Sequence, residues 1–223
     1  MIVYGRQPVA ELLRAGRRRA LRVWAVKDPG FPFTHASSDE LARLAGTDAH
    51  QGIAAEAEPY HYVHAAELLV RDGLVLVLDE VQDPQNLGAI CRTAEVAGAL
   101  GVVIHDRRAA EVTPAVCKAS AGAVEHLAIA RVRNIADFLG EAKEAEFWCY
   151  GAAASGSVSC FDVDWPGRVA LVLGAEGKGI RPRVAKACDE LVSVPMRGRL
   201  DSLNVSATAA VLTYLALQRE LRP

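Results

Sequence analysis

The chain has 223 residues, of which 51% are hydrophobic and 23% are charged, a composition typical of a folded globular protein. Its formal net charge of -2 gives it no general electrostatic affinity for nucleic acid. The sequence contains no apolar stretch of the roughly 20 residues that cross a bilayer, and it does not begin with a signal-peptide pattern, so we expect a cytoplasmic protein with no membrane partner.

Residues 1–58 predict a small α+β unit. The apolar spacing and turn residues indicate a helix at 7–15, a strand at 21–26, a helix at 38–45 and a strand at 52–57. Arginines cluster between residues 14 and 22, which suits either phosphate contacts or the solvated end of a helix. Proline and polar residues at 56–59 predict a linker, so we place a domain boundary between residues 58 and 59.

Residues 59–223 alternate strands with helices. The aliphatic run at 74–81 predicts a strand that is buried on both faces of a parallel sheet. Further strands are expected at 101–106, 126–132, 147–152, 168–174 and 191–195, and helices at 87–98, 113–121, 135–145 and 202–220. This alternation predicts an α/β fold with a mostly parallel sheet flanked by helices.

The cysteines and histidines give no indication of a metal site. Five cysteines are scattered without a paired spacing, which argues against a disulfide framework and against a zinc site. All five lie among apolar or small residues, so we expect buried thiols with no catalytic role. The histidines flank strands and turns, where structural roles are the usual ones.

Ligands of such sheets bind beyond the carboxyl ends of the strands, where loops lead into helices. Three loops of this kind are unusual: residues 79–92, 174–182 and 195–206. In the first, Asn86 suits a helix N-cap and Gly88 suits a close backbone approach. Arg92 is then either a surface cation or a side chain directed into the crevice between the loops.

The second loop is rich in glycine, with Gly174, Gly177 and Gly179 close together. Their spacing matches neither the dinucleotide fingerprint nor the P-loop. Glu176 lies among them, and its carboxylate would repel a phosphate. The loop therefore suits a ligand with donor groups or positive charge.

The third loop leads into an apolar helix. Ser202 suits the N-cap of that helix, and Asn204 then falls in its first turn. The helix that follows is apolar on nearly every side, which predicts that it is buried on every side. In a chain of this length a second copy is the simplest cover, so we expect a homodimer.

Together the three loops resemble the three motifs of the SpoU (TrmH-like) family of RNA 2′-O-ribose methyltransferases, part of the SPOUT superfamily. The matching segments are DPQNLGAICRTAEVAGA (83–99), LVLGAEGKGI (171–180) and VPMRGRLDSLNVSATAA (194–210). The segments Tyr4-Gly5 and His50-Gln51-Gly52 are similar to the start and the end of the L30e-like domain that precedes the catalytic domain in the rRNA-modifying branch. Here that domain is truncated between Pro29 and His50.

The resemblance implies a SPOUT-type parallel sheet with a C-terminal trefoil knot, S-adenosyl-L-methionine as cofactor and no metal. It implies an RNA partner, with methylation of a ribose 2′-OH in a guanosine of large-subunit ribosomal RNA in preference to tRNA. By position, the cofactor pocket would be lined by Gly174, Val194 and Leu203. The catalytic site would consist of Asn86, Arg92, Glu176, Ser202 and Asn204, in which the guanidinium stabilises the developing alkoxide.

Two alternatives stay open. A nucleotide-dependent oxidoreductase or NTPase would use the glycine-rich loop, although the missing fingerprints and Glu176 argue against it. A non-catalytic RNA-binding dimer would keep the fold and lose the site, although the matching polar residues argue against such a loss.

Overall fold

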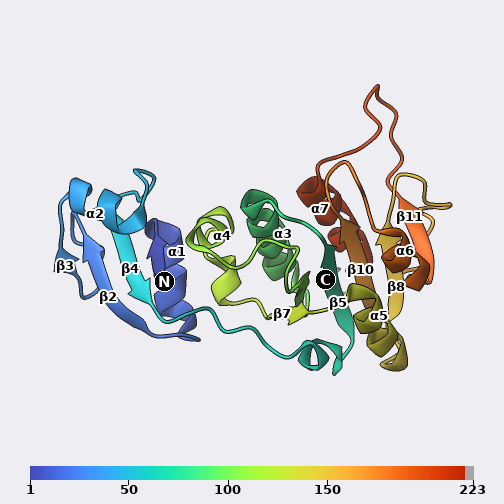
Figure 1. Ribbon diagram of the computed structural model, residues 1–223, viewed down its shortest axis with the longest axis horizontal. Helices are drawn as coiled ribbons and strands as arrows, with labels where there is room; N and C mark the ends of the chain where they lie inside the picture. The colour runs from blue at the N-terminus through green and yellow to red at the C-terminus, as the bar shows by residue number, and fades with distance from the viewer. Residues whose placement is uncertain (219–223) are drawn as a thin grey trace.

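The computed structural model describes residues 1–218, which form two β-sheets arranged along an elongated molecule (Figure 1). The small sheet lies at one end and has the strand order β1-β4-β2-β3. Its strands are β1 (Ile2–Tyr4), β2 (Ala20–Ala25), β3 (Thr34–His35) and β4 (Ile53–Ala57). Helix α1 (Arg6–Ala15) and helix α2 (Ser38–Ala45) contact β4, whose alternate residues join two different apolar clusters.

The large sheet has seven strands in the order β7-β6-β5-β10-β8-β11-β9, and every neighbouring pair is parallel. The central strands are β5 (Gly73–Asp79) and β10 (Arg168–Gly174). On one side of them lie β6 (Gly101–His105) and β7 (Ile129–Val132), and on the other β8 (Trp148–Ala152), β11 (Glu190–Ser193) and β9 (Val158–Ser159). This confirms the predicted α/β fold with a parallel sheet.

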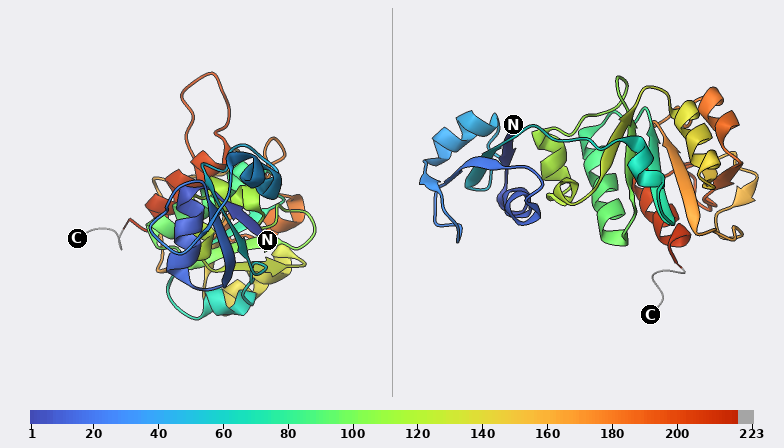
Figure 2. Two further views of the ribbon diagram at one scale, coloured as in Figure 1. Left: turned by 90° about the vertical axis from the view of Figure 1, so that its left-hand side faces the viewer. Right: turned by 90° about the horizontal axis from the view of Figure 1, so that it is seen from below.

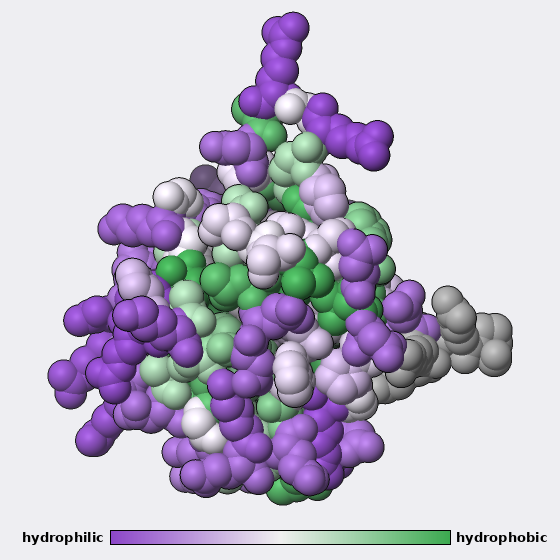
Figure 3. Space-filling model, turned by 90° about the vertical axis from the view of Figure 1, so that its right-hand side faces the viewer, coloured by the Kyte–Doolittle hydropathy of each residue, from purple (hydrophilic) through white to green (hydrophobic). Residues whose placement is uncertain are grey.

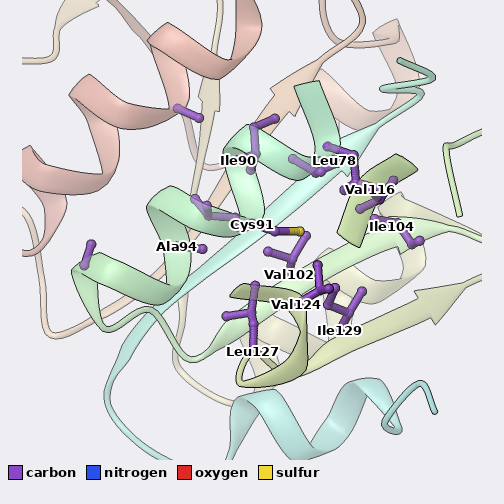
Figure 4. Packing of buried hydrophobic residues seen from close by; sticks show 14 of the residues in the cluster. Leu78, Ile90, Cys91, Ala94, Val102, Ile104, Val116, Val124, Leu127 and Ile129 are labelled. Atoms are coloured by element: carbon purple, nitrogen blue, oxygen red, sulfur yellow. The ribbon is translucent and has the colours of Figure 1, made fainter. Parts of the chain in front are cut away.

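Helices cover both faces of the large sheet (Figure 2). Strand β5 is buried along its whole length, because its residues alternate between the two apolar clusters that these helices complete. One face packs against α3 (Pro84–Ala97), α4 (Pro114–Ala119) and α7 (Val205–Ala216), as Figure 4 shows around Ile90 and Ile104. The other face packs against α5 (Ile135–Glu144) and α6 (Pro182–Ala187).

The small sheet and the large sheet share a core and a buried ion pair. One apolar cluster contains Val9 and Leu12 of α1 together with residues of α3, α4 and the large sheet. Beside it, the Arg18 guanidinium donates from Nε to Glu125 Oε2 at 2.9 Å and from Nη2 to Glu125 Oε1 at 2.6 Å. Glu125 lies in a short 3-10 turn, η2 (Ala123–Glu125), and both side chains are 2% exposed. The two units are therefore docked on each other.

Two expected helix caps are wrong. Helix α3 begins at Pro84 and its N-cap is Asp83, whose side chain accepts from Gln85 N at 3.0 Å. Asn86 therefore lies inside the helix, because proline without a backbone N–H suits the first helical position. Helix α7 begins at Val205 and its N-cap is Asn204, not Ser202.

Several short elements were not predicted, namely β1, β3, β9, α6, η2 and the 3-10 helix η1 (Ala65–Leu69). Four of the five cysteines are buried, as expected, and Cys188 is half-buried. Burial raises the pKa of Cys149 to about 12. Within residues 1–218, no helix has the length and apolar character that crossing a membrane requires.

Candidate active site

A cavity of about 900 Å³ opens at the carboxyl ends of β8, β10 and β11. Its walls come from these strand ends, from the loop after β10, from the segment that follows β11, and from the first turn of α7. The three residues predicted to bind the cofactor, Gly174, Val194 and Leu203, all line it. The second and third of the loops singled out in the sequence thus meet around one cavity.

The loop after β10 closes tightly on itself. Gly179 N donates to the Ala175 carbonyl at 2.8 Å, and Ala175 N donates back to the Gly179 carbonyl at 3.2 Å. A Cβ on Gly174 would lie 2.1 Å from the carbonyl carbon of Gly179, so no other residue fits without moving the loop. Gly177 and Gly179 have φ of 71° and 65°, a region that glycine adopts without strain.

Glu176 connects three segments that are far apart in the chain. Its Oε1 accepts from Asn86 Nδ2 at 2.5 Å and from Asn204 Nδ2 at 2.8 Å. The first amide comes from buried Asn86 of α3, and the second comes from the residue that caps α7. Asn204 Oδ1 in turn accepts from the backbone N of Ser206 at 2.8 Å. Because a carboxylate only accepts, it orients both amides with their nitrogens toward it.

The cavity has an apolar part and an acidic part. Leu173, Val192 and Val194 supply apolar surface, while Glu176, Asp201 and Lys178 are the charged residues of the wall, so one negative charge is in excess. Ser202 lines it too, and its Oγ donates to Asp201 Oδ1 at 3.3 Å. Such a wall fits a ligand that combines a flat apolar ring with a positive charge, as S-adenosyl-L-methionine does, and does not favour a polyphosphate.

The structure does not bring Arg92 into this cavity. The side chain is exposed, is not among the lining residues, and makes no hydrogen bond or ion pair with any residue in the described range 1–218. Arg92 lies six residues after Asn86 on the same helix, and at about 100° per residue the two side chains point about 120° apart. Its neighbour on that face is Val96, which is 63% exposed.

The segment between β11 and α7 stands away from the body of the protein. Every residue from Pro195 to Asn204 is exposed, and Leu200 is 80% exposed. Figure 2 shows the segment as a long projecting loop, and Figure 3 shows hydrophilic side chains at its tip. Its base, through Leu203 and Asn204, forms part of the cavity wall.

A buried ion pair that was not predicted from the sequence lies behind the glycine-rich loop. Asp79, which is fully buried at the end of β5, accepts from the backbone N and from Nε of Arg181, both at 2.8 Å. The hydrogen-bonded carboxylate raises the pKa of Arg181. The pair fixes the chain where it leaves the loop, and the signal in the sequence was an aspartate that ends an aliphatic strand.

Comparison with known proteins places this arrangement in a family. Residues 73–214 match the family model described as SpoU rRNA Methylase family, and residues 2–63 match the one described as RNA 2′-O ribose methyltransferase substrate binding. YacO of Bacillus subtilis, assigned to the TrmH family of tRNA/rRNA methyltransferases, is 37% identical over 95% of this chain and 93% of its own length. An uncharacterized tRNA/rRNA methyltransferase of Synechocystis is 36% identical over 91% of this chain, which spans 54% of that relative.

A solved structure has the same fold. AviRb, a SpoU methyltransferase from Streptomyces viridochromogenes crystallised with AdoMet, gives a TM-score of 0.84 at 23% identity, over 99% of this chain and 90% of its own. The fold, the cavity and the two family matches define the class of RNA methyltransferases, which are transferases. More narrowly, the chain belongs to the SpoU rRNA Methylase family.

Proposed function

We propose that this protein transfers the methyl group of S-adenosyl-L-methionine to a ribose 2′-OH of RNA, with a guanosine of large-subunit ribosomal RNA as the target. The observation that carries the proposal is the Glu176 carboxylate, which holds the amides of Asn86 and Asn204 at the wall of the 900 Å³ cavity. The match of residues 2–63 to a substrate-binding module of ribose methyltransferases supports the ribose as acceptor. The AdoMet in the AviRb crystal supports the methyl donor.

The residues of the cavity fit the proposed donor. Val194 and Leu203 offer apolar surface to the adenine ring, and Gly174 keeps the loop backbone close enough to contact it. The bound cofactor supplies a methyl group on a positively charged sulfur, and the nearby carboxylates of Glu176 and Asp201 favour that charge. Asn204 and Ser202 then lie where they would orient the ribose.

Arg92 has a separate task in this proposal. A guanidinium stays protonated throughout the physiological range, so it acts through its charge and not as a base. It stabilises the developing alkoxide and holds the adjacent RNA phosphate, which accepts the hydroxyl proton. This requires Arg92 to reach the methyl donor, which it does not do within one chain.

We therefore propose a homodimer in which Arg92 of one copy completes the site of the other. Helices α3 and α7 contact each other, and each has an exposed apolar side chain: Val96 on α3 is 63% exposed and Tyr214 on α7 is 47% exposed. Arg92 lies one turn before Val96 on α3, and exposed apolar side chains together with an exposed arginine suit an interface between two copies. A two-fold interface supplies both sites at once, because each copy gives and receives the same groups.

The remaining parts of the family pattern are proposed on the same basis. A trefoil knot in the C-terminal part is supported by the way the 174–179 loop and the 194–204 segment share one cavity. An L30e-like character of the small unit is supported by its α+β content and its family match. We propose that the protein acts in the cytoplasm.

Labelled methyl transfer tests the activity directly. Purified protein, tritiated S-adenosyl-L-methionine and unmodified transcripts of large-subunit rRNA or tRNA should give labelled rRNA, and nuclease digestion should locate the label on a 2′-O-methylguanosine. Label on a base, or no label on either RNA, contradicts the proposed reaction. Label on tRNA alone would show that the substrate is tRNA and not large-subunit rRNA.

Mixing two inactive variants tests the shared site. Arg92→Ala and Glu176→Ala should each abolish transfer. When equal amounts are unfolded together and refolded, about half of the dimers are mixed, and each mixed dimer has one intact site, which restores about a quarter of the wild-type activity. No restoration would mean that both residues act within one chain.

A further inference from the structure

A second cavity, of about 490 Å³, lies at the carboxyl ends of β6 and β7 and is lined mainly by arginine. We call it the arginine cleft and define it by Arg107, Arg108, Arg133, Arg181 and Arg183. It lies outside residues 2–63, which match the substrate-binding family model, and none of its residues lines the 900 Å³ cavity.

We propose that the arginine cleft binds the phosphate backbone of the substrate RNA, beside the nucleotide that is methylated. This rests on the proposed function, because it assumes an RNA substrate. It adds a contact surface on the catalytic domain that is separate from the small unit.

The charge of the cleft is free to bind an anion. Arg107 and Arg133 are exposed and have no ion pair with any other residue in the described part of the chain. Arg108 pairs with Glu80 at 3.1 Å and Arg183 with Asp137 at 3.3 Å, but these guanidinium groups belong to side chains that are 60% and 76% exposed. Exposed pairs of this kind contribute at most about 1 kcal/mol and exchange readily for a phosphate.

The acidic groups near the cleft do not cancel its charge. Asp79 and Glu80 both contact Arg181. Asp106 is the one carboxylate among the described lining residues, against five arginines, so the lining has an excess of positive charge. The chain as a whole carries a net charge of -2, so this excess of positive charge is a local feature.

The lining of the cleft favours a phosphate backbone over a base. Among the described residues that line it there is no Phe, Tyr or Trp, and Val184 is the one aliphatic side chain, so charge outweighs apolar surface. Guanidinium groups match phosphate oxygens with paired hydrogen bonds, and several of them spaced along a groove suit a chain of phosphates.

Its position suits an RNA strand that also enters the methyl-transfer cavity. The loop after β10 lines that cavity as far as Gly179, and two residues later Arg181 lines the cleft. In the sheet only β5 separates β6 from β10, which places the two strand ends about 10 Å apart. A few consecutive nucleotides of one strand span such a distance.

The test compares arginines on opposite edges of the sheet. The variants Arg107→Ala, Arg133→Ala and the double variant are compared with Arg71→Ala. Arg71 lies just before β5 at the amino edge, is exposed, and has no ion pair with any other residue from 1 to 218. Binding of an unmodified rRNA transcript is measured by fluorescence anisotropy between 0.1 and 1 M salt. S-adenosyl-L-methionine binding, measured by calorimetry, reports whether each variant is folded.

Each lost phosphate contact should lower the slope of log affinity against log salt by about 0.7 for single-stranded RNA. The double variant should therefore bind RNA about 25-fold more weakly at 0.1 M salt, with the difference vanishing toward 1 M, while Arg71→Ala keeps the wild-type slope. Equal effects of Arg71→Ala and the cleft variants, or wild-type RNA binding by the double variant, overturn the proposal.

The experiment distinguishes a failure of the cleft assignment from a failure of the proposed function. If the wild-type protein binds RNA and methylates it but the double variant does so equally well, only the cleft assignment fails. If the wild-type protein neither binds nor methylates RNA, the proposed function fails and the cleft assignment fails with it. Binding of ATP that is lost in the double variant, with RNA binding unchanged, would reassign the cleft to a nucleotide.

Discussion

Replacing Arg18 by methionine should destabilise the protein strongly, because it leaves the Glu125 carboxylate buried without its partner. Both side chains are 2% exposed and are joined by two hydrogen bonds of 2.6 and 2.9 Å. Arg18 also donates to the Glu58 carbonyl at 2.9 Å and lies 5.7 Å from the centre of the Tyr60 ring. Breaking a buried pair on one side costs about 3–5 kcal/mol. That is a large part of a typical stability of about 5–15 kcal/mol.

Urea unfolding followed by circular dichroism measures this cost. Arg18→Met should lower the midpoint by about 1–2 M, given a urea dependence of about 3 kcal/mol per M. The double variant Arg18→Met/Glu125→Leu removes both charges and should lie within about 1 kcal/mol of the wild type. Arg19→Met is the matched control, because its pair with Glu58 is 3.5 Å long and its side chain is 75% exposed, so it should cost less than about 1 kcal/mol.

The Arg18–Glu125 pair should affect RNA binding and not S-adenosyl-L-methionine binding. The pair joins the small unit to the catalytic domain, so the double variant should keep S-adenosyl-L-methionine binding while its KM for RNA rises. An Arg18→Met variant as stable as the wild type would refute the view that this pair docks the two units.

Three other predictions concern the cavity and the thiols. Gly174→Ala should reduce S-adenosyl-L-methionine binding at least tenfold by calorimetry, because its Cβ would collide with Gly179, whereas Gly140→Ala, which meets nothing within 4 Å, should have no effect. Glu176→Gln should lower kcat/KM about 10–100-fold in the methyl-transfer assay and lower Tm by about 4–8 °C, because two charge-assisted hydrogen bonds weaken by about 1 kcal/mol each. Cys149, with its pKa raised to about 12, has only about one thiolate in ten thousand at pH 8 and should resist iodoacetamide until the protein is unfolded, as followed by mass spectrometry.

The sequence is most informative where burial and periodicity act together. The aliphatic run of β5 is buried at every position, and β10 has the bounds that its pattern predicts. Strand β9 has two residues and helix α6 has six, which is too short for a periodic signal. The cap of α3 was misplaced because Asp83 and Asn86 are both good N-caps, and only Pro84 distinguishes them.

Long-range pairing could not be predicted from local sequence. The arginines between residues 14 and 22 suited either phosphate contacts or a solvated helix end. The structure divides them, because Arg18 is buried against Glu125, 107 residues away, while Arg14, Arg17 and Arg19 are exposed. Nothing in the spacing of these arginines distinguishes one from the others. The tertiary fold determines which of these arginines is buried against a residue so distant in the sequence.

Helical geometry accounts for the separation of Arg92 from Asn86. Asn86 is held by Glu176 on the inner side of α3, and helical geometry then turns Arg92 by about 120° away from it, whatever the surroundings. A rotamer change moves a guanidinium along its own face of a helix but does not carry it through the helix to the other side. Within one chain, the two side chains therefore point to different sides of α3. If both residues act on the same ribose, we expect one of them to come from a second copy of the chain. The activity recovered on mixing Arg92→Ala with Glu176→Ala tests this expectation.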